Sequence, residues 1–267
     1  MELEYGKKEV EGVKVNITDC KTALSDSGLE SDYALNPYRG CSHGCLYCYS
    51  PYVIKEERHW GDFLDVKRNI PRVLAKELKN KDRGVVRVGS VTDPYQKAEK
   101  QYSLTRKCLF QLKNKEFPVI VQTKSPIVKR DIDLYTEMNI DIGFTVTSLN
   151  EEFRSVFEPG APPVSERLSA IRELNEEGID TWVFIGPLLP YVNDSEEDLR
   201  RLKNTLESIG VEEIYLDKLN MRKGMWSDIK EQLDEDLIKK YKQIYFGDQD
   251  YFKKKKKIYN KYGKTVF

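Results

Sequence analysis

The sequence has no apolar run near the roughly 18 residues needed to cross a bilayer. Its first residues also lack the cationic and then apolar pattern of a signal peptide, so we expect a cytoplasmic protein that does not engage a membrane. A charge surplus is missing too, because 44 Lys and Arg residues balance 44 Asp and Glu residues. The molecule as a whole therefore has no strong field to steer a polyanion toward it.

Cysteine is scarce, and the five residues present are an odd number. Without a secretory signal, this count argues against a disulfide framework and favours a metal or redox role. Hydrophobic residues make up 39% of the 267 positions and charged residues 33%, which excludes a disordered chain. We expect one large globular domain with a well-solvated surface.

From residue 85 onward, short apolar segments alternate with helical patterns, which is typical of successive βα units and a parallel sheet. Polar or Gly/Pro residues follow each apolar segment, and in βα barrels the loops after the strands build the active site. The predicted strands are 85–88, 119–122, 142–147, 182–185 and 214–216, and the predicted helices are 103–113, 131–138, 165–177, one opening at Ser195, and 234–245.

Three of the five cysteines fall in the segment 36–49, with the spacing C-x3-C-x2-C. They are Cys41, Cys45 and Cys48. Thiolates are soft ligands suited to iron–sulfur clusters, and a loop containing Gly40 and Gly44 can wrap so that three sulfurs face one cluster. Three ligands leave a fourth iron open to an exogenous ligand. The alternative is zinc held by the three cysteines and His43, although zinc sites usually pair two ligand hairpins and this sequence has one.

This cysteine segment resembles the signature of the radical S-adenosylmethionine (SAM) superfamily, which has an aromatic residue before the last cysteine, here Tyr47. The resemblance covers roughly residues 35–219 and implies an α/β fold, a partial (β/α)6 TIM-type barrel. It also implies a [4Fe–4S] cluster that reductively cleaves S-adenosylmethionine to a 5′-deoxyadenosyl radical, and an electron donor such as a flavodoxin or ferredoxin. We expect a short N-terminal extension (1–33), the barrel (34–220) and a C-terminal helical extension (221–267).

More narrowly, the chain looks like the spore photoproduct lyase-like, or DNA repair photolyase-like, branch of that superfamily. The segments 36–49, 91–96, 122–125 and 158–162 carry this likeness. It implies that Lys124 and Ser148 hold the methionyl carboxylate of S-adenosylmethionine and that Tyr47 lies near the adenine, whereas Lys124 could instead be a solvated strand-end residue. The full set of expected contacts is Tyr47, Tyr49, Ser90, Thr92, Lys124 and Ser148.

True spore photoproduct lyases have a hydrogen-donating cysteine at the end of the second barrel strand. Residues 90–93 of this chain are Ser-Val-Thr-Asp, so that lyase activity is not predicted. Cys108 lies among leucines at helical spacing and is expected to be a small buried residue. Cys20 is expected to be a structural thiol, or else to lie over the open end of the barrel. Tyr95 could relay an electron or hydrogen and Asp93 could orient a substrate, or both anchor their loop around Pro94.

The branch resemblance and an aromatic, Lys-rich C-terminal tail together favour a nucleic-acid base or nucleotide as the substrate. The rings of that tail either stack on bases or pack the last helices onto the barrel, and the lysine run 253–257 is expected to be a solvated helix face. Two alternatives remain open: a radical SAM enzyme that modifies a peptide or small metabolite, and a non-catalytic iron–sulfur or zinc module. We expect Glu158 and Arg167 to form an ion pair in an architectural turn.

Overall fold

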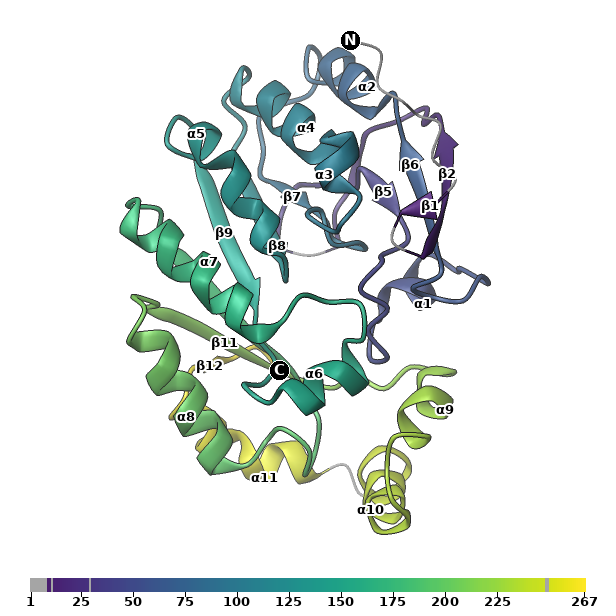
Figure 1. The fold of residues 1–267 in the computed structure, drawn as a ribbon, viewed down its shortest axis with the longest axis vertical. Helices are drawn as coiled ribbons and strands as arrows, with labels where there is room; N and C mark the ends of the chain where they lie inside the picture. Colours follow the sequence, from purple (N-terminus) through teal and green to yellow (C-terminus); the bar gives the residue numbers. More distant parts are fainter. Residues whose placement is uncertain (1–8, 11, 29, 248–249) are drawn as a thin grey trace.

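A computed structural model of the protein describes residues 9–10, 12–28, 30–247 and 250–267. Its main feature is a curved sheet with the strand order β12-β11-β10-β9-β8-β7-β4-β3 (Figure 1). These strands are β3 (Leu24–Asp26), β4 (Tyr33–Leu35), β7 (Val86–Val88), β8 (Val119–Thr123), β9 (Ile140–Thr145), β10 (Thr181–Leu188), β11 (Glu213–Lys218) and β12 (Lys264–Thr265). From β4 to β11 every neighbouring pair is parallel. The partial (β/α)6 barrel expected from the sequence is therefore confirmed.

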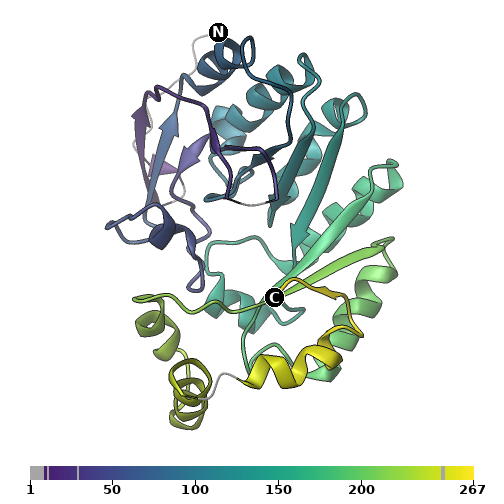
Figure 2. The same cartoon turned by 180° about the vertical axis from the view of Figure 1, so that it is seen from behind.

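Helices cover the convex face of this sheet, as Figures 1 and 2 both show. They pack on strand residues such as Val86, Val88 and Val121, all fully buried, because alternate side chains of a strand point to the same face. Ser195 caps one of these helices by accepting the Asp198 N–H at 3.1 Å, as the sequence indicates. The outer helices are α2 (Ile70–Glu77), α4 (Leu104–Lys113), α5 (Ile132–Tyr135), α7 (Val164–Glu176) and α8 (Glu196–Glu207). Shorter helices are α1 (Ser50–Val53), α3 (Glu99–Tyr102), α6 (Glu151–Phe157) and the 3₁₀ helix η1 (Pro126–Asp131).

A second sheet, which the sequence analysis does not predict, lies beside the start of the barrel. Its strand order is β1-β2-β6-β5, with bounds β1 (Glu9–Val10), β2 (Val13–Thr18), β5 (Tyr38–Arg39) and β6 (Phe63–Lys67). Strands β2 and β6 are parallel partners about fifty residues apart in the chain, with Lys14 opposite Phe63. The N-terminal extension thus supplies β1 and β2 to this sheet and β3 to the edge of the barrel.

The C-terminal extension packs against the barrel through α9 (Met225–Lys230), α10 (Glu235–Phe246) and α11 (Asp250–Tyr259). The buried carboxylate of Asp194 accepts hydrogen bonds from the hydroxyls of Tyr251 and Tyr259 at 2.6 and 2.7 Å. Phe252 and Tyr241 are buried as well, so these rings pack the last helices onto the barrel, whereas the Phe246 ring is exposed. Among the described residues no helix has both the length and the apolar composition of a membrane span.

Candidate functional site

The cysteine loop, residues 40–49, lies between β5 and α1 and is wrapped tightly at its glycines. Gly40 and Gly44 have positive φ angles of 93° and 56°, which favour glycine. The loop is also pressed from outside, because a Cβ on Gly160 would come within 2.0 Å of the Ser42 carbonyl oxygen. Gly61, just before β6, packs on Gly44 in the same way. The second sheet and the turn before α7 therefore hold the loop from two sides.

All three loop cysteines are free thiols. Burial raises the pKa of Cys45 to about 12, and it raises the pKa of Cys41 and of Cys48 as well. Iron binds thiolates, so loading of this loop releases protons.

The donor set of the cysteine loop fits an iron–sulfur cluster, because its three free thiols are soft ligands and each thiolate of a cubane binds a separate iron. Two buried polar atoms, Ser42 Oγ and His43 Nε2, also lack a hydrogen-bond partner within the described residues, as expected beside a bound group.

The loop that follows β7 fixes the position of the cysteine loop. The buried Gln96 side chain accepts the Ser42 N–H at 2.9 Å and donates to Thr92 Oγ1 at 2.9 Å. The Thr92 hydroxyl in turn donates to the Gly40 carbonyl at 2.5 Å. Thr92, an expected S-adenosylmethionine contact, thus lies in a network that positions the loop, and Gln96 is a site residue that the sequence analysis misses.

Asp93 joins the cysteine loop to the end of β8. Its carboxylate accepts the Thr123 hydroxyl at 2.7 Å and the Lys124 backbone N–H at 2.8 Å. It also lies 3.4 Å from Nδ1 of the buried His43, whose pKa is lowered to about 4 mainly by burial. Of the two roles considered for Asp93, the structure supports the loop anchor. Tyr95 is likewise an anchor, since its buried hydroxyl donates to Asp131.

Lys124 carries a charged group beside the cysteine loop that no other side chain neutralises by contact. Its Nζ lies 5.6 Å from the centre of the Tyr47 ring, and within the described residues it makes neither an ion pair nor a hydrogen bond. Burial disfavours the charge, but nearby Cys45, Glu158 and Asp93 outweigh burial and raise the pKa of Lys124. The ammonium is therefore charged and available to bind an anion.

A buried ion pair supports Tyr47 from behind. The Glu158 carboxylate accepts hydrogen bonds from the hydroxyls of Tyr47 and Thr147 and pairs with Arg167, confirming the ion pair expected from the sequence. Burial opposes ionisation of Glu158, but the charges of Lys124 and Arg167 and the Tyr47 hydroxyl lower its pKa to about 2. Because its hydroxyl is bound to Glu158, Tyr47 has mainly its ring to offer a ligand.

Tyr49 is held beside the end of β7 by Ser90, another of the expected site residues. Its hydroxyl donates to the Ser90 carbonyl at 2.5 Å, and the Ser90 hydroxyl accepts from Asn36 at 3.0 Å. The Tyr49 side chain remains exposed. The structure therefore brings Tyr49 and Ser90 together next to the cysteine loop.

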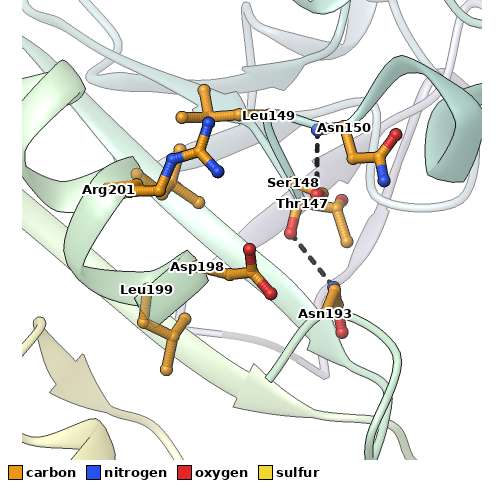
Figure 3. Close-up of a pocket in the computed structure, with 9 residues that line it drawn as sticks. Thr147, Ser148, Leu149, Asn150, Asn193, Asp198, Leu199 and Arg201 are labelled. Carbon is orange, nitrogen blue, oxygen red and sulfur yellow. Dashed lines mark hydrogen bonds between the residues drawn. The ribbon is translucent and has the colours of Figure 1, made fainter. Parts of the chain in front are cut away.

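Ser148 lines a cavity of about 200 Å³ between the β9–α6 connection and α8 (Figure 3). Its hydroxyl accepts the Asn150 N–H at 3.0 Å, and Asn193 donates to the neighbouring Thr147 carbonyl at 3.0 Å. Lys124 does not line this cavity. The structure thus places Ser148 in different surroundings from Lys124, and its contact with a carboxylate stays a prediction.

The two other cysteines lie away from the loop. Cys108 is fully buried in α4, in agreement with its expected role as a small core residue. Cys20 is half-buried, and its backbone exchanges hydrogen bonds with the Asn69 side chain at 2.8 and 2.9 Å. It is therefore attached to the start of α2.

Residues 35–202 match the radical SAM superfamily. The chain belongs to this superfamily. An uncharacterized protein of Methanocaldococcus jannaschii is 34% identical over 168 residues, which is 61% of this chain and 63% of that relative, so the match spans less than two thirds of its length. An uncharacterized protein of Acidianus two-tailed virus is 30% identical over 243 residues, or 81% of this chain and 80% of that protein. A radical SAM Nalpha-GlyT isomerase of Pseudomonas phage M6 is 24% identical over 183 residues, covering 65% of this radical SAM chain and 36% of the isomerase.

Among solved structures, spore photoproduct lyase complexed with dinucleoside spore photoproduct matches with a TM-score of 0.67. The alignment covers 83% of this chain and 68% of the lyase at 17% identity. A lyase variant with bound S-adenosylmethionine and the same dinucleoside matches with a TM-score of 0.65, the same coverage and 17% identity. This radical SAM protein therefore has the fold of the spore photoproduct lyase-like branch.

Proposed function

We propose that Cys41, Cys45 and Cys48 hold a [4Fe–4S] cluster with which the protein cleaves S-adenosylmethionine to act on a nucleic-acid base or nucleotide. The observation that carries this proposal is the unpaired ammonium of Lys124 beside a loop of three free thiols. When bound, the cluster supplies the electron that breaks the sulfonium and yields a 5′-deoxyadenosyl radical. A flavodoxin or ferredoxin would deliver that electron to the cluster.

The side chains around the loop bind and orient the cofactor in this proposal. Lys124 pairs with the methionyl carboxylate, because an ammonium supplies a point charge for an anion. Asp93 fixes the Lys124 backbone, and Glu158 fixes the Tyr47 ring under it. Tyr49, Ser90, Thr92 and Ser148 complete the proposed set, with Thr92 acting through the position of the loop.

A base or nucleotide as the substrate is supported by what the similar proteins act on or bind. The lyase of the matching structure is complexed with a dinucleoside photoproduct. Residues 90–93 include no cysteine, so we do not propose the hydrogen-atom route of the lyase for this chain. The proposal is therefore a radical SAM enzyme of this branch with a reaction of its own.

Anaerobic reconstitution with iron and sulfide, followed by dithionite and S-adenosylmethionine, tests the proposed chemistry. We expect the visible absorbance of an iron–sulfur cluster to appear on reconstitution and 5′-deoxyadenosine to be released on reduction. A non-catalytic iron–sulfur or zinc module would release no 5′-deoxyadenosine, and that result would refute the proposal that the protein is an enzyme. Binding to single-stranded DNA or RNA at low salt, weakened as salt rises, would indicate a polynucleotide substrate.

Replacing Lys124 with alanine is expected to weaken S-adenosylmethionine binding about ten- to a hundredfold. A hydrogen bond to a charged group contributes about 1.5–3 kcal/mol, which corresponds to that range of affinity. The iron content should stay unchanged, because the lysine contacts the ligand and not the cysteines. Calorimetric titration of the reconstituted variant measures the affinity, and an iron assay provides the control. Equal affinities with a normal cluster would show that Lys124 is only a strand-end residue.

A further inference from the structure

The concave face of the barrel sheet carries an arginine that has no partner among the described residues. On β7, Val86 and Val88 are fully buried on the convex side, so Arg87 between them points to the concave side. It lies in register with Ala34 on β4 and Ile120 on β8. Lys124 is four residues beyond Ile120, about 13 Å farther along the same strand. The two cations thus lie at different depths on the same side of the sheet.

Nothing in the described residues neutralises Arg87 by contact. Its guanidinium makes no ion pair and no hydrogen bond there, and its Nε is buried without a partner. Burial lowers its pKa, whereas Tyr49, Asp141 and Glu30 lie near enough to favour the charge without touching it. A partly buried, unpaired arginine lowers the free energy of unfolding. Its presence is explained if a ligand supplies the missing hydrogen-bond acceptors.

An aromatic surface lies on the same, concave side of the sheet, on β10 and β11. Trp182 on β10 lies flat against the sheet, because a Cβ on its register partner Gly143 would come within 2.2 Å of the indole. One face of the indole covers Gly143, and the other is directed away from the sheet. Tyr215 on β11 meets the indole edge-on at 5.7 Å, and both rings are half-buried. Such a ring is suited to stacking on a nucleobase.

We propose that Arg87 binds a phosphate group of the substrate while Trp182 stacks on its base, which makes the substrate a nucleotide carrying a phosphate. A planar guanidinium binds phosphate through two parallel hydrogen bonds, and the aromatic surface supplies the apolar contact that a base requires. This inference rests on the proposed function, because it names the substrate class for the same barrel.

The test is calorimetric binding of the four deoxynucleoside 5′-monophosphates, and of the matching nucleosides, to reconstituted protein saturated with S-adenosylmethionine. At least one monophosphate should bind, and Arg87→Gln should weaken it about ten- to a hundredfold, since a charged hydrogen bond is lost. Nucleoside binding should be weak and equal in both proteins. Arg83→Gln is the matched control, because Arg83 is a surface arginine paired with Glu116 ahead of the same strand.

The stability of the Arg87→Gln variant, measured by urea unfolding, provides a second test. Replacing Arg87 leaves no other described group without a hydrogen-bond partner, so Arg87→Gln should not lower the midpoint of urea unfolding. Loss of an arginine with a structural role would lower that midpoint. If Arg87→Gln fails to fold, Arg87 serves the stability of the fold and the proposal is overturned. Arg87→Lys, which keeps the charge but not the planar fork, should retain part of the monophosphate affinity.

Three binding results would overturn the proposal. One is equal affinity of a monophosphate for wild type and Arg87→Gln. Another is Arg87-dependent binding of a carboxylate probe such as N-acetylaspartate in place of every monophosphate, which would indicate a peptide or acidic metabolite. The third is no monophosphate binding at all. If 5′-deoxyadenosine still forms in these cases, only the Arg87 inference fails, whereas its absence refutes the proposed function itself.

Discussion

Cys45→Ala is expected to remove nearly all of the iron from the reconstituted protein, and Cys41→Ala and Cys48→Ala are expected to do the same. Three thiolates are the protein ligands of the proposed cluster, so loss of one leaves only two to hold a cubane. Release of 5′-deoxyadenosine should disappear together with the cluster absorbance. Iron and sulfide assays after anaerobic reconstitution measure the effect directly.

Cys20→Ala and Cys108→Ala are the matched controls for the loop cysteines. Cys20 lies against the start of α2 and Cys108 within the core of α4, so neither should change the iron content. Should Cys20→Ala lose as much iron as Cys45→Ala, the cluster would have a fourth protein ligand. The open iron position, and with it the binding of S-adenosylmethionine, would then have to be abandoned.

Glu158→Leu is expected to destabilise the protein by about 3–5 kcal/mol. The substitution leaves Arg167 buried with no carboxylate, and an uncompensated buried charge costs about that much. It also frees the hydroxyl of Tyr47 beside the cysteine loop, so S-adenosylmethionine affinity should fall along with stability. Urea unfolding of the reconstituted protein, with iron assayed on the same samples, gives the first effect, and titration gives the second.

Two controls separate the buried pair from an ordinary surface contact. Glu158→Leu combined with Arg167→Leu removes both charges and should recover much of the lost stability. Glu173→Gln breaks an exposed pair with Lys129 and should cost at most about 1 kcal/mol. A Glu158→Leu variant as stable as wild type would show that the pair contributes no stability.

The lowered pKa of Glu158 sets the pH range in which this stabilisation is present. Its pKa falls from 4.5 to about 2 on folding, so the carboxylate contributes fully above the unfolded value. The contribution is lost as the pH decreases from about 4.5 to about 2. The stability difference between wild type and Glu158→Leu should therefore narrow over that range.

Local patterns in the sequence determined the barrel strands from β7 to β11 and the clustering of three cysteines in one loop. The spacing of Cys41, Cys45 and Cys48 within fourteen residues predicts one loop with three sulfurs, since nearby residues cannot separate far. The alternating apolar segments predict the parallel strands from β7 to β11, because each buries a face on its own helix. The cap at Ser195 is equally local, because the Ser195 hydroxyl bonds a backbone N–H three residues on, whereas the C-terminal rings pack through contacts far along the chain, such as those with Asp194.

Only the tertiary structure decided which of these local features meet. The sheet formed by β2 and β6 joins residues about fifty positions apart, so this pairing depends on how the fold brings the two strands together. The contacts of Asp93 and Gln96 with the cysteine loop, and the hydroxyl of Tyr47 with Glu158, depend on strand order and loop direction. Strand order and loop direction also decide that Arg87 has no partner among the described residues. A charge is neutralised only when the fold places an opposite charge or a hydrogen-bond acceptor within reach. The sequence by itself thus determined the superfamily and the loop of three cysteines, and the fold decided which polar side chains contact that loop and which have no partner among the described residues.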